Sequence, residues 1–126
     1  MYFELDKLPV YSVDDDMDAR SATPIYDQSD IRSAATSMCI FHFGPGQSRS
    51  EHIHEREAEI YIPLAGRGKL IIEDIPYEMR PGVVCYVPPK HRHITLNDGD
   101  ERLDLLCIFS PHFSLDYVRQ WNRGEK

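Results

Sequence analysis

The sequence contains no long hydrophobic run. Its longest apolar stretches, 60–65 and 82–89, are far shorter than the ~20 residues that a membrane-spanning helix needs. Basic residues are also few, because 14 Lys and Arg stand against 21 Asp and Glu and leave a formal net charge of −7. This charge repels a phosphate backbone, and the sequence has neither a basic stripe nor a Gly-rich phosphate loop. We therefore expect neither a membrane nor a nucleic acid as a partner.

Cysteine is scarce as well. With only Cys39, Cys85 and Cys107 in the chain, at least one thiol must stay unpaired. Each lies among apolar or aromatic neighbours, which favours buried, reduced thiols of the kind found in cytosolic proteins. Residues 1–10 alternate apolar with charged side chains and lack the basic segment and long apolar run of a secretory signal. We therefore expect a cytoplasmic location.

The length of 126 residues suits one hydrophobic core. A hydrophobic content of 41% with 28% charged residues is typical of a globular protein. We predict a single domain over 1–126, with N-terminal strands and loops at 1–36, a barrel core at 37–113 and a C-terminal helix at 114–126. A short acidic run at 14–16 predicts a solvated turn between the N-terminal segments.

From Ser37 onward the chain is strand-like. Short β-branched and aromatic runs alternate with Gly, Pro and Asn-Asp-Gly turns at spacings of about 8–12 residues, which is typical of an all-β sandwich or barrel. The predicted strands are 38–43, 59–64, 68–73, 83–87, 93–96 and 103–110. After them, Ser114 is followed at helical spacing by Leu115, Val118 and Trp121, which predicts a short helix on the outside of the barrel.

A group of histidines carries the chemistry. His52 and His54 are two residues apart, so in an extended strand their side chains share one face and can converge on one metal ion. The polar residues 55–58 predict a turn, and a hairpin there would bring Glu59 to that face as an oxygen ligand. His93 follows a proline-rich turn and would arrive from the opposite wall. For His52 and His54 taken alone, the alternative is a pair of strand histidines that face solvent or form hydrogen bonds in the core.

These two segments resemble the two sequence motifs of the cupin superfamily. The first, G-x5-H-x-H-x4-E-x6-G, is matched at every spacing by Gly46, His52, His54, Glu59 and Gly66. The second, G-x5-P-x-G-x2-H-x3-N, is matched by Gly82, Pro88, His93 and Asn97. Lys90 stands where the second glycine is usual, although a residue with positive φ prefers glycine.

The resemblance implies a double-stranded β-helix (jelly-roll) barrel, a homodimer, and His52, His54, Glu59 and His93 as metal ligands. Such a set leaves one or two coordination positions open and suits Fe(II), Mn(II), Ni(II), Co(II) or Zn(II). A metal-dependent enzyme acting on a small polar or anionic metabolite, as a dioxygenase or a lyase/isomerase, is the expected function. A non-catalytic small-molecule-binding or sensor protein, and a barrel that the metal merely stabilises, are the alternatives.

Further residues are candidates around this site. Tyr61, His91 and Glu51 are candidate acid or base groups, and Arg49 is the natural anchor for a carboxylate substrate. By alternation, the residues expected to point inward are Tyr86, Phe43, Phe109 and Cys107, although filling the core is the simpler role for each. An N-terminal strand near residues 2–8 is our candidate for an edge exchanged between two copies.

Overall fold

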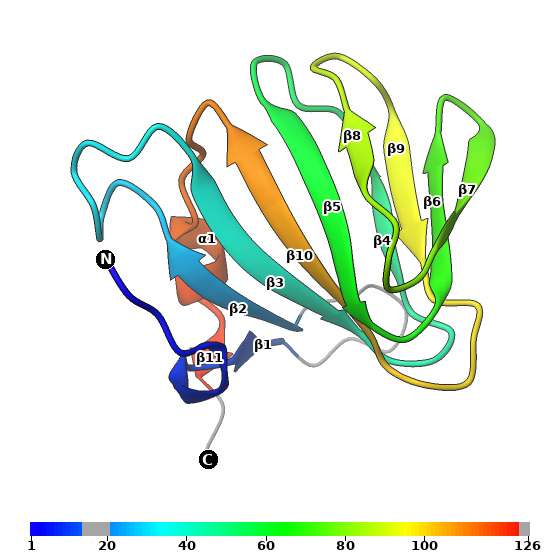
Figure 1. Ribbon diagram of the computed structural model, residues 1–126, viewed down its shortest axis with the longest axis horizontal. Helices are drawn as coiled ribbons and strands as arrows, with labels where there is room; N and C mark the ends of the chain where they lie inside the picture. The colour runs from blue at the N-terminus through cyan, green and yellow to red at the C-terminus, as the bar shows by residue number, and fades with distance from the viewer. Residues whose placement is uncertain (14–20, 124–126) are drawn as a thin grey trace.

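Two antiparallel sheets form the computed structural model, which describes residues 1–13 and 21–123 (Figure 1). Within these residues, the seven-stranded sheet has the order β11 (Asn122–Arg123), β1 (Tyr11–Ser12), β2 (Ser21–Tyr26), β3 (Ser37–Phe43), β10 (Leu103–Ser110), β5 (Ala58–Ala65) and β8 (Cys85–Val87). The four-stranded sheet has the order β4 (Ser48–His52), β9 (His93–Leu96), β6 (Gly68–Ile72) and β7 (Ile75–Met79). The acidic run at 14–16 lies outside the described residues.

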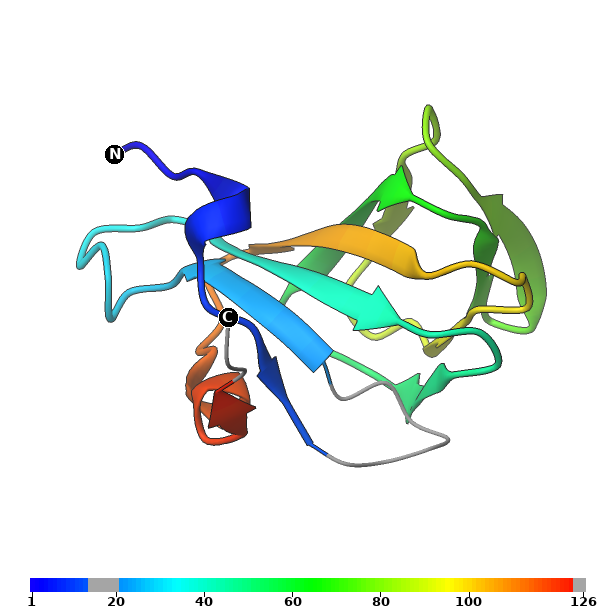
Figure 2. The same ribbon diagram turned by 90° about the horizontal axis from the view of Figure 1, so that it is seen from below.

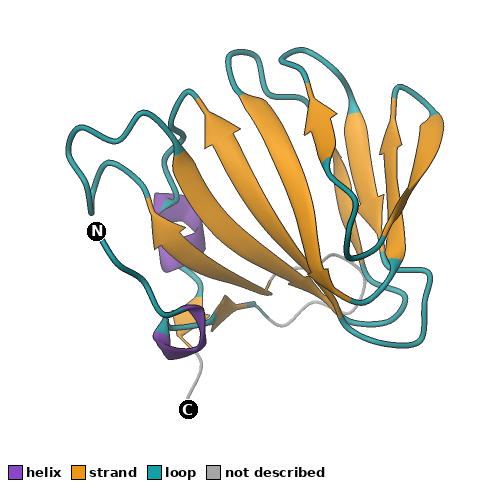
Figure 3. Cartoon of the chain, in the orientation of Figure 1, coloured by secondary structure: helices purple, strands orange, loops and turns teal. Residues whose placement is uncertain are grey.

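Side chains from both sheets fill the space between them. In the seven-stranded sheet, Phe41 lies opposite Leu105, and Cys107 lies opposite Cys39. These residues are buried together with Leu70 and Met79 of the other sheet. Because strand side chains alternate between faces, every second residue of β3, β5 and β10 enters this core. The predicted all-β jelly roll is confirmed (Figure 3).

The six predicted strands correspond to observed ones, and three features differ from the prediction. The predictions at 93–96 and 103–110 match β9 and β10, whereas only 85–87 of the 83–87 run forms strand β8. Strand β7 was not predicted, because its first four residues are all exposed and give no alternation. The predicted N-terminal strand near 2–8 is wrong, since Leu5–Lys7 forms a 3-10 helix beside an ion pair of Lys7 with Glu4.

The C-terminal helix is shorter than predicted. Helix α1 spans Asp116–Arg119, and the chain then turns back so that β11 pairs with β1. The Ser114 hydroxyl accepts a hydrogen bond from the backbone N–H of Asp116, as expected for a residue before a helix. Leu115 and Val118 are fully buried in the core cluster, so this segment contributes to the interior and does not merely cover the barrel. None of the helices in the described residues is both long and apolar enough to span a bilayer.

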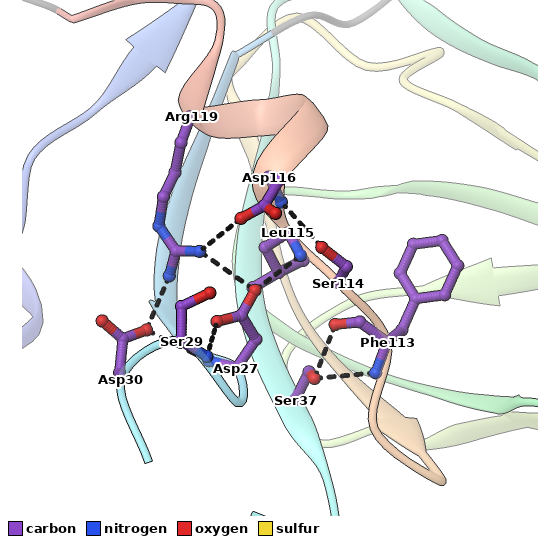
Figure 4. Close-up of polar contacts among 9 residues, drawn as sticks. All are labelled: Asp27, Ser29, Asp30, Ser37, Phe113, Ser114, Leu115, Asp116 and Arg119. Atoms are coloured by element: carbon purple, nitrogen blue, oxygen red, sulfur yellow. Dashed lines mark hydrogen bonds and ion pairs between the residues drawn. The ribbon is translucent and has the colours of Figure 1, made fainter. Parts of the chain in front are cut away.

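A buried carboxylate ties this segment to the sheet (Figure 4). Asp27 accepts hydrogen bonds from the backbone N–H groups of Leu115 at 2.7 Å and Ser29 at 2.8 Å, and Arg119 pairs with it at 3.0 Å. Burial acts to raise the pKa of Asp27, but these hydrogen bonds and the guanidinium outweigh it, and the pKa is lowered. The ionised form is therefore the one that the fold stabilises.

We expect Asp27→Asn to lower the free energy of unfolding by about 2–4 kcal/mol at pH 7, since it breaks a buried, hydrogen-bonded ion pair. A lowered folded-state pKa contributes stability that is complete above the unfolded pKa of about 3.9 and is lost as the pH falls below it. The difference between wild type and variant should therefore shrink below about pH 4 in urea titrations.

The matched control is Asp116→Asn, because Asp116 is exposed and lies 3.6 Å from the same guanidinium. It should change stability by less than about 0.5 kcal/mol. Equal losses from the two variants, or a difference that persists unchanged at pH 3, would contradict this role for Asp27.

Candidate metal centre

Four side chains from both sheets converge at one point inside the molecule. His52 ends β4, His54 follows it in a loop, His93 begins β9, and Glu59 lies near the start of β5 in the other sheet. One ligand atom from each of them lies within 4.8 Å of all the others, close enough to hold one metal ion. The Oε1 atom of Glu59 is 3.2 Å from Nε2 of His93, 3.3 Å from Nε2 of His54 and 3.8 Å from Nε2 of His52.

The local structure explains this convergence. In the antiparallel pair of β4 and β9, His52 lies directly opposite His93, so their rings are only 4.0 Å apart between centroids. The predicted hairpin at 55–58 is wrong, because β4 pairs with β9 whereas β5 pairs with β10 and β8. The chain instead crosses from one sheet to the other between His52 and Ala58. This crossing lets Glu59 face the histidines from the opposite wall.

Backbone carbonyls fix which ring nitrogen faces the centre. The Nδ1 atom of His52 is 2.9 Å from the carbonyl oxygen of Ser50, and Nδ1 of His93 is 3.0 Å from that of His91. A carbonyl oxygen only accepts, so in both rings Nδ1 carries the proton that is donated. The other ring nitrogen, Nε2, faces Glu59, and in a neutral ring it is the atom that remains available to bind a metal ion.

The electrostatics of Glu59 suit a cation. This carboxylate is only 2% exposed. Burial acts to raise its pKa, but hydrogen bonds with His52, His54 and His93 hold the pKa well below its usual range. A buried anion surrounded by three imidazole nitrogens is a donor set of intermediate hardness, so the residues present fit a divalent transition-metal ion.

A cavity that opens to solvent is lined by three of these four residues, His52, His54 and Glu59. The other side chains that line it are Phe41, Phe43, Arg49, Tyr61, Thr95, Phe109 and Tyr117. The guanidinium of Arg49 lies 5.0 Å from the ring centroid of Phe41 and 5.8 Å from that of Tyr117. Burial acts to lower the pKa of Arg49, but its interactions with Tyr117, Tyr61 and Glu59 raise it, so the cavity holds a permanent cation.

The structure brings several predicted residues to this cavity. Arg49, Tyr61, Phe43 and Phe109 all line it. Burial, followed by the charge of Glu59, raises the pKa of Tyr61 well above its usual value. Cys107 also points inward but is fully buried in the core, where burial raises the pKa of its thiol.

Three other predicted residues lie elsewhere. Tyr86 is 59% exposed, and its predicted inward orientation is wrong because it pairs with Ile60 on the outer face of the sheet. Glu51 points to the surface, where it pairs with Arg92. The ring of His91 hydrogen-bonds the carbonyl of Pro89, 3.0 Å away, and does not line the cavity.

Sequence reasoning missed three lining residues. Thr95 lies two positions after His93, and Phe41 lies two positions before Phe43, so alternation along the strands could have found both. Tyr117 belongs to helix α1, and its approach to Arg49 depends on how the C-terminal segment folds back, for which the sequence has no local signal.

Lys90 adopts the backbone conformation of the glycine that it replaces. Its φ is 67°, in the left-handed region, and its backbone N–H donates to the carbonyl of His54 over 2.7 Å. This turn therefore holds the loop that carries His54. Lys90 keeps the hydrogen bond to His54. A side chain in this left-handed conformation, however, lowers the free energy of unfolding by about 1 kcal/mol relative to glycine.

We therefore expect Lys90→Gly to raise the free energy of unfolding by up to about 1 kcal/mol, because relief of the strain outweighs the extra chain entropy of glycine. Lys90→Ala keeps a Cβ atom and should leave stability within about 0.5 kcal/mol of wild type. Chemical denaturation of the three proteins checks this, and a Gly variant less stable than the Ala variant would contradict it.

Comparison with known proteins places the chain in a family. The sequence profile of the Cupin domain family matches residues 39–109, which is more than half of the chain. The chain therefore belongs to the cupins. It is 36% identical over 80 residues to the glucose-6-phosphate isomerase of Pyrococcus abyssi, a match that covers 58% of this chain and 42% of the isomerase. The chain thus matches less than half of the length of this relative.

Solved structures agree on the fold. A protein of Thermotoga maritima described as a predicted oxalate decarboxylase superimposes with a TM-score of 0.77 at 20% identity, covering 88% of this chain and 99% of that one. A putative sugar phosphate isomerase of Acidithiobacillus ferrooxidans has a TM-score of 0.59 at 26% identity, covering 71% of this chain and 59% of that one. The chain is therefore a cupin with a donor cluster suited to a divalent metal ion.

Proposed function

We propose that this cupin is a metal-dependent enzyme that acts on a small molecule bearing a carboxylate, by dioxygenase or lyase/isomerase chemistry. One observation carries the proposal: three members of the donor cluster, which are His52, His54 and Glu59, line the same cavity as the half-buried side chain of Arg49. An open-sided metal centre beside a fixed cation can bind two ends of one anionic substrate.

In this proposal His52, His54, Glu59 and His93 hold one divalent ion, with Fe(II), Mn(II), Ni(II), Co(II) and Zn(II) all compatible with the donor set. When bound, such an ion would supply a Lewis acid next to the cavity. The protein provides the orientation of the ligands, since the carbonyls of Ser50 and His91 hold two of the rings in place.

Arg49 supplies recognition of the substrate. Its flat, delocalised guanidinium presents paired N–H donors that match the two oxygens of a carboxylate. The rings of Phe41 and Tyr117 near it limit its freedom, so little conformational entropy remains to be lost when a substrate binds. The walls formed by Phe43 and Phe109 are apolar, and they exclude water from the remainder of the substrate.

Similar proteins bear on the class of reaction. A solved structure described as a predicted oxalate decarboxylase, at 20% identity, and one described as a putative sugar phosphate isomerase, at 26% identity, favour lyase or isomerase chemistry for this chain. The carboxylate in the proposal rests on the guanidinium of Arg49 in the cavity.

The test is turnover of a substrate panel by the chain loaded in turn with each of the five metals. The panel contains small mono-, di- and hydroxycarboxylates and sugar phosphates, and the readouts are oxygen uptake, release of carbon dioxide and proton NMR of the products. Turnover of small carboxylates is expected, and turnover of sugar phosphates alone would contradict the substrate class. Binding of metal and carboxylate without turnover would favour a sensor.

Arg49→Met is expected to raise KM for the carboxylate substrate by about 100-fold, because it removes the charge partner from a buried site. Arg49→Lys keeps the charge but not the paired donors, so its KM should lie between those of the wild type and Arg49→Met. The matched control is Arg67→Met, since Arg67 is exposed and forms an ion pair with Glu78 at the surface, away from the cavity. An unchanged KM in Arg49→Met would overturn the role of Arg49.

We also propose a cytoplasmic location and a homodimeric assembly. All three cysteine thiols are free, and those of Cys39 and Cys107 are fully buried, which suits a reducing compartment. Fractionation of cells that produce the chain tests the location. Gel filtration of the full chain tests the assembly, and elution as a monomer would contradict it.

A further inference from the structure

An irregularity in strand β4 brings Arg49 to the same cavity as the donor cluster. Side chains three residues apart, such as those of Arg49 and His52, point to opposite faces of a regular strand. Here the register shifts between these two residues, so that three steps along β4 match two steps along β9. A bulge of this kind re-aims the side chains beside it. Both Arg49 and His52 therefore line the cavity.

The long side chain of Arg49 needs further contacts to stay in one position, because an arginine has many rotamers to lose. Its guanidinium carbon lies over the ring of Phe41, 5.0 Å from the centroid, and over that of Tyr117, 5.8 Å from the centroid. Of these two rings only Tyr117 has a hydroxyl. Burial acts to lower the pKa of Arg49, but electrostatic attraction to Tyr117 and a hydrogen bond between the two side chains raise it.

The chain is fixed on both sides of Tyr117. Two residues before it, the backbone N–H of Leu115 donates to Asp27 over 2.7 Å, and two residues after it Arg119 pairs with the same carboxylate over 3.0 Å (Figure 4). Leu115 and Val118 are buried in the core. Figure 2 shows helix α1 and the N-terminal 3-10 helix on opposite sides of strand β2. Tyr117 therefore approaches Arg49 from the core side of the sheet.

Aromatic neighbours hold the ring of Tyr117 itself. Phe113, Tyr117 and Trp121 follow one another at intervals of four residues, and the centroids of successive rings are 6.0 and 5.9 Å apart. Phe113 also lies edge-on to His54 of the donor cluster, with 5.2 Å between centroids. Burial raises the pKa of Tyr117 to about 12, so at neutral pH it meets Arg49 as a neutral phenol. The C-terminal segment thus contacts both the donor cluster and the cation beside it.

We propose that Tyr117 is the positioning residue of Arg49, holding the guanidinium against Phe41 inside the cavity so that a carboxylate meets it in one orientation. A cation held in this way costs less entropy to order when a ligand binds. The inference rests on the proposed function for the identity of the ligand, but not for the contact between Tyr117 and Arg49. Because Tyr117 also lines the cavity, the alternative is a direct contact of its side chain with the ligand.

The first measurement needs no ligand. It is the nitrogen-15 relaxation of the Arg49 Nε–H group in the full chain, a signal that is identified by its loss in Arg49→Met. In the wild type the order parameter should be typical of a rigid group, about 0.85, and in Tyr117→Leu it should fall below about 0.6. Tyr117→Phe keeps the ring and loses the hydroxyl, so its value should lie between those of the wild type and Tyr117→Leu.

The second measurement is the dissociation constant of acetate, oxalate and malonate, followed by calorimetry on the full chain saturated with Zn(II). Tyr117→Leu should raise the dissociation constant of the carboxylate that binds by about 10-fold, and Tyr117→Phe by about 3-fold. In the Arg49→Met background, Tyr117→Leu should change it by less than about 2-fold, because the effect of Tyr117 passes through Arg49.

The matched control is Val118→Ala, which removes buried atoms from the core side of the same helix and should leave the order of Arg49 unchanged. Far-ultraviolet circular dichroism shows whether each variant keeps its fold.

Three results would overturn the inference. They are an Arg49 side chain that stays equally ordered in Tyr117→Leu, an equal loosening of Arg49 in Val118→Ala, and an equal effect of Tyr117→Leu on binding with and without Arg49. The last of these would assign Tyr117 a direct contact with the ligand. A wild type that binds none of the three carboxylates, while Tyr117→Leu still loosens Arg49, would contradict the proposed substrate class and support the positioning role.

Discussion

A His93→Asn chain is expected to bind divalent metal at least about 100-fold more weakly than wild type while keeping its fold, because a first ligand contributes at least as much as the outer groups that orient it. His93 is almost fully buried, and its Nε2 lies 3.2 Å from Oε1 of Glu59. The asparagine amide can still donate to the carbonyl of His91, but it offers no nitrogen lone pair at the centre.

Titration with Mn(II) or Co(II), followed by calorimetry or by the visible absorption of cobalt, measures this loss. The matched control is His91→Asn, two residues earlier, which should bind metal as the wild type does. Metal should also raise the melting temperature of wild type and control but not that of His93→Asn. Equal affinity in wild type and His93→Asn would contradict a ligand role for His93.

Asn97→Ala is expected to lower the free energy of unfolding by about 3 kcal/mol, a large share of the 5–15 kcal/mol that a domain typically has. The Asn97 side chain is fully buried. Its Nδ2 donates to the carbonyls of Phe43 and Glu101 at 2.9 and 2.8 Å, and its Oδ1 accepts from the N–H of Gly99 at 3.0 Å. Alanine leaves all three backbone groups without this partner.

Urea unfolding of this variant is best compared with that of Asp98→Asn. The neighbouring Asp98 is exposed and forms a surface ion pair with Lys69. Its replacement should cost less than about 0.5 kcal/mol. If Asn97→Ala lowered the free energy of unfolding by less than about 1 kcal/mol, other groups or solvent would replace the hydrogen bonds of Asn97, which would contradict this role. The expected loss explains why an asparagine ends the second motif.

The sequence predicted the fold and the donor cluster because both depend on spacing. His52 and His54 share a face by alternation, and the motif residues Glu59 and His93 complete the cluster on other strands. Gly66 shows the same logic in the backbone: its φ is +82°, and a Cβ there would collide with the carbonyl of Arg102. The positive φ of Gly66 is a local constraint, and a glycine at a fixed place in a motif reveals it in the sequence.

What could not be predicted depends on register and on long-range folding. Tyr61 and Tyr86 both lie in alternating runs, yet Tyr61 pairs with Cys85, and this register turns Tyr86 outward. A shift of one residue would have reversed the two faces. Tyr117 approaches Arg49 from helix α1, and the residue before this helix, Leu115, is hydrogen-bonded to Asp27, 88 residues away along the chain. No local pattern encodes such a contact.

Anomalous X-ray scattering tests most directly whether His52, His54, Glu59 and His93 hold one metal ion. Crystals of the chain are grown with Mn(II), Fe(II), Co(II), Ni(II) or Zn(II), and data are recorded on both sides of the absorption edge of the metal. We predict one strong peak per chain, about 2.0–2.3 Å from Nε2 of His52, His54 and His93 and from a carboxylate oxygen of Glu59. A peak located elsewhere, or none at saturating metal, would contradict the account.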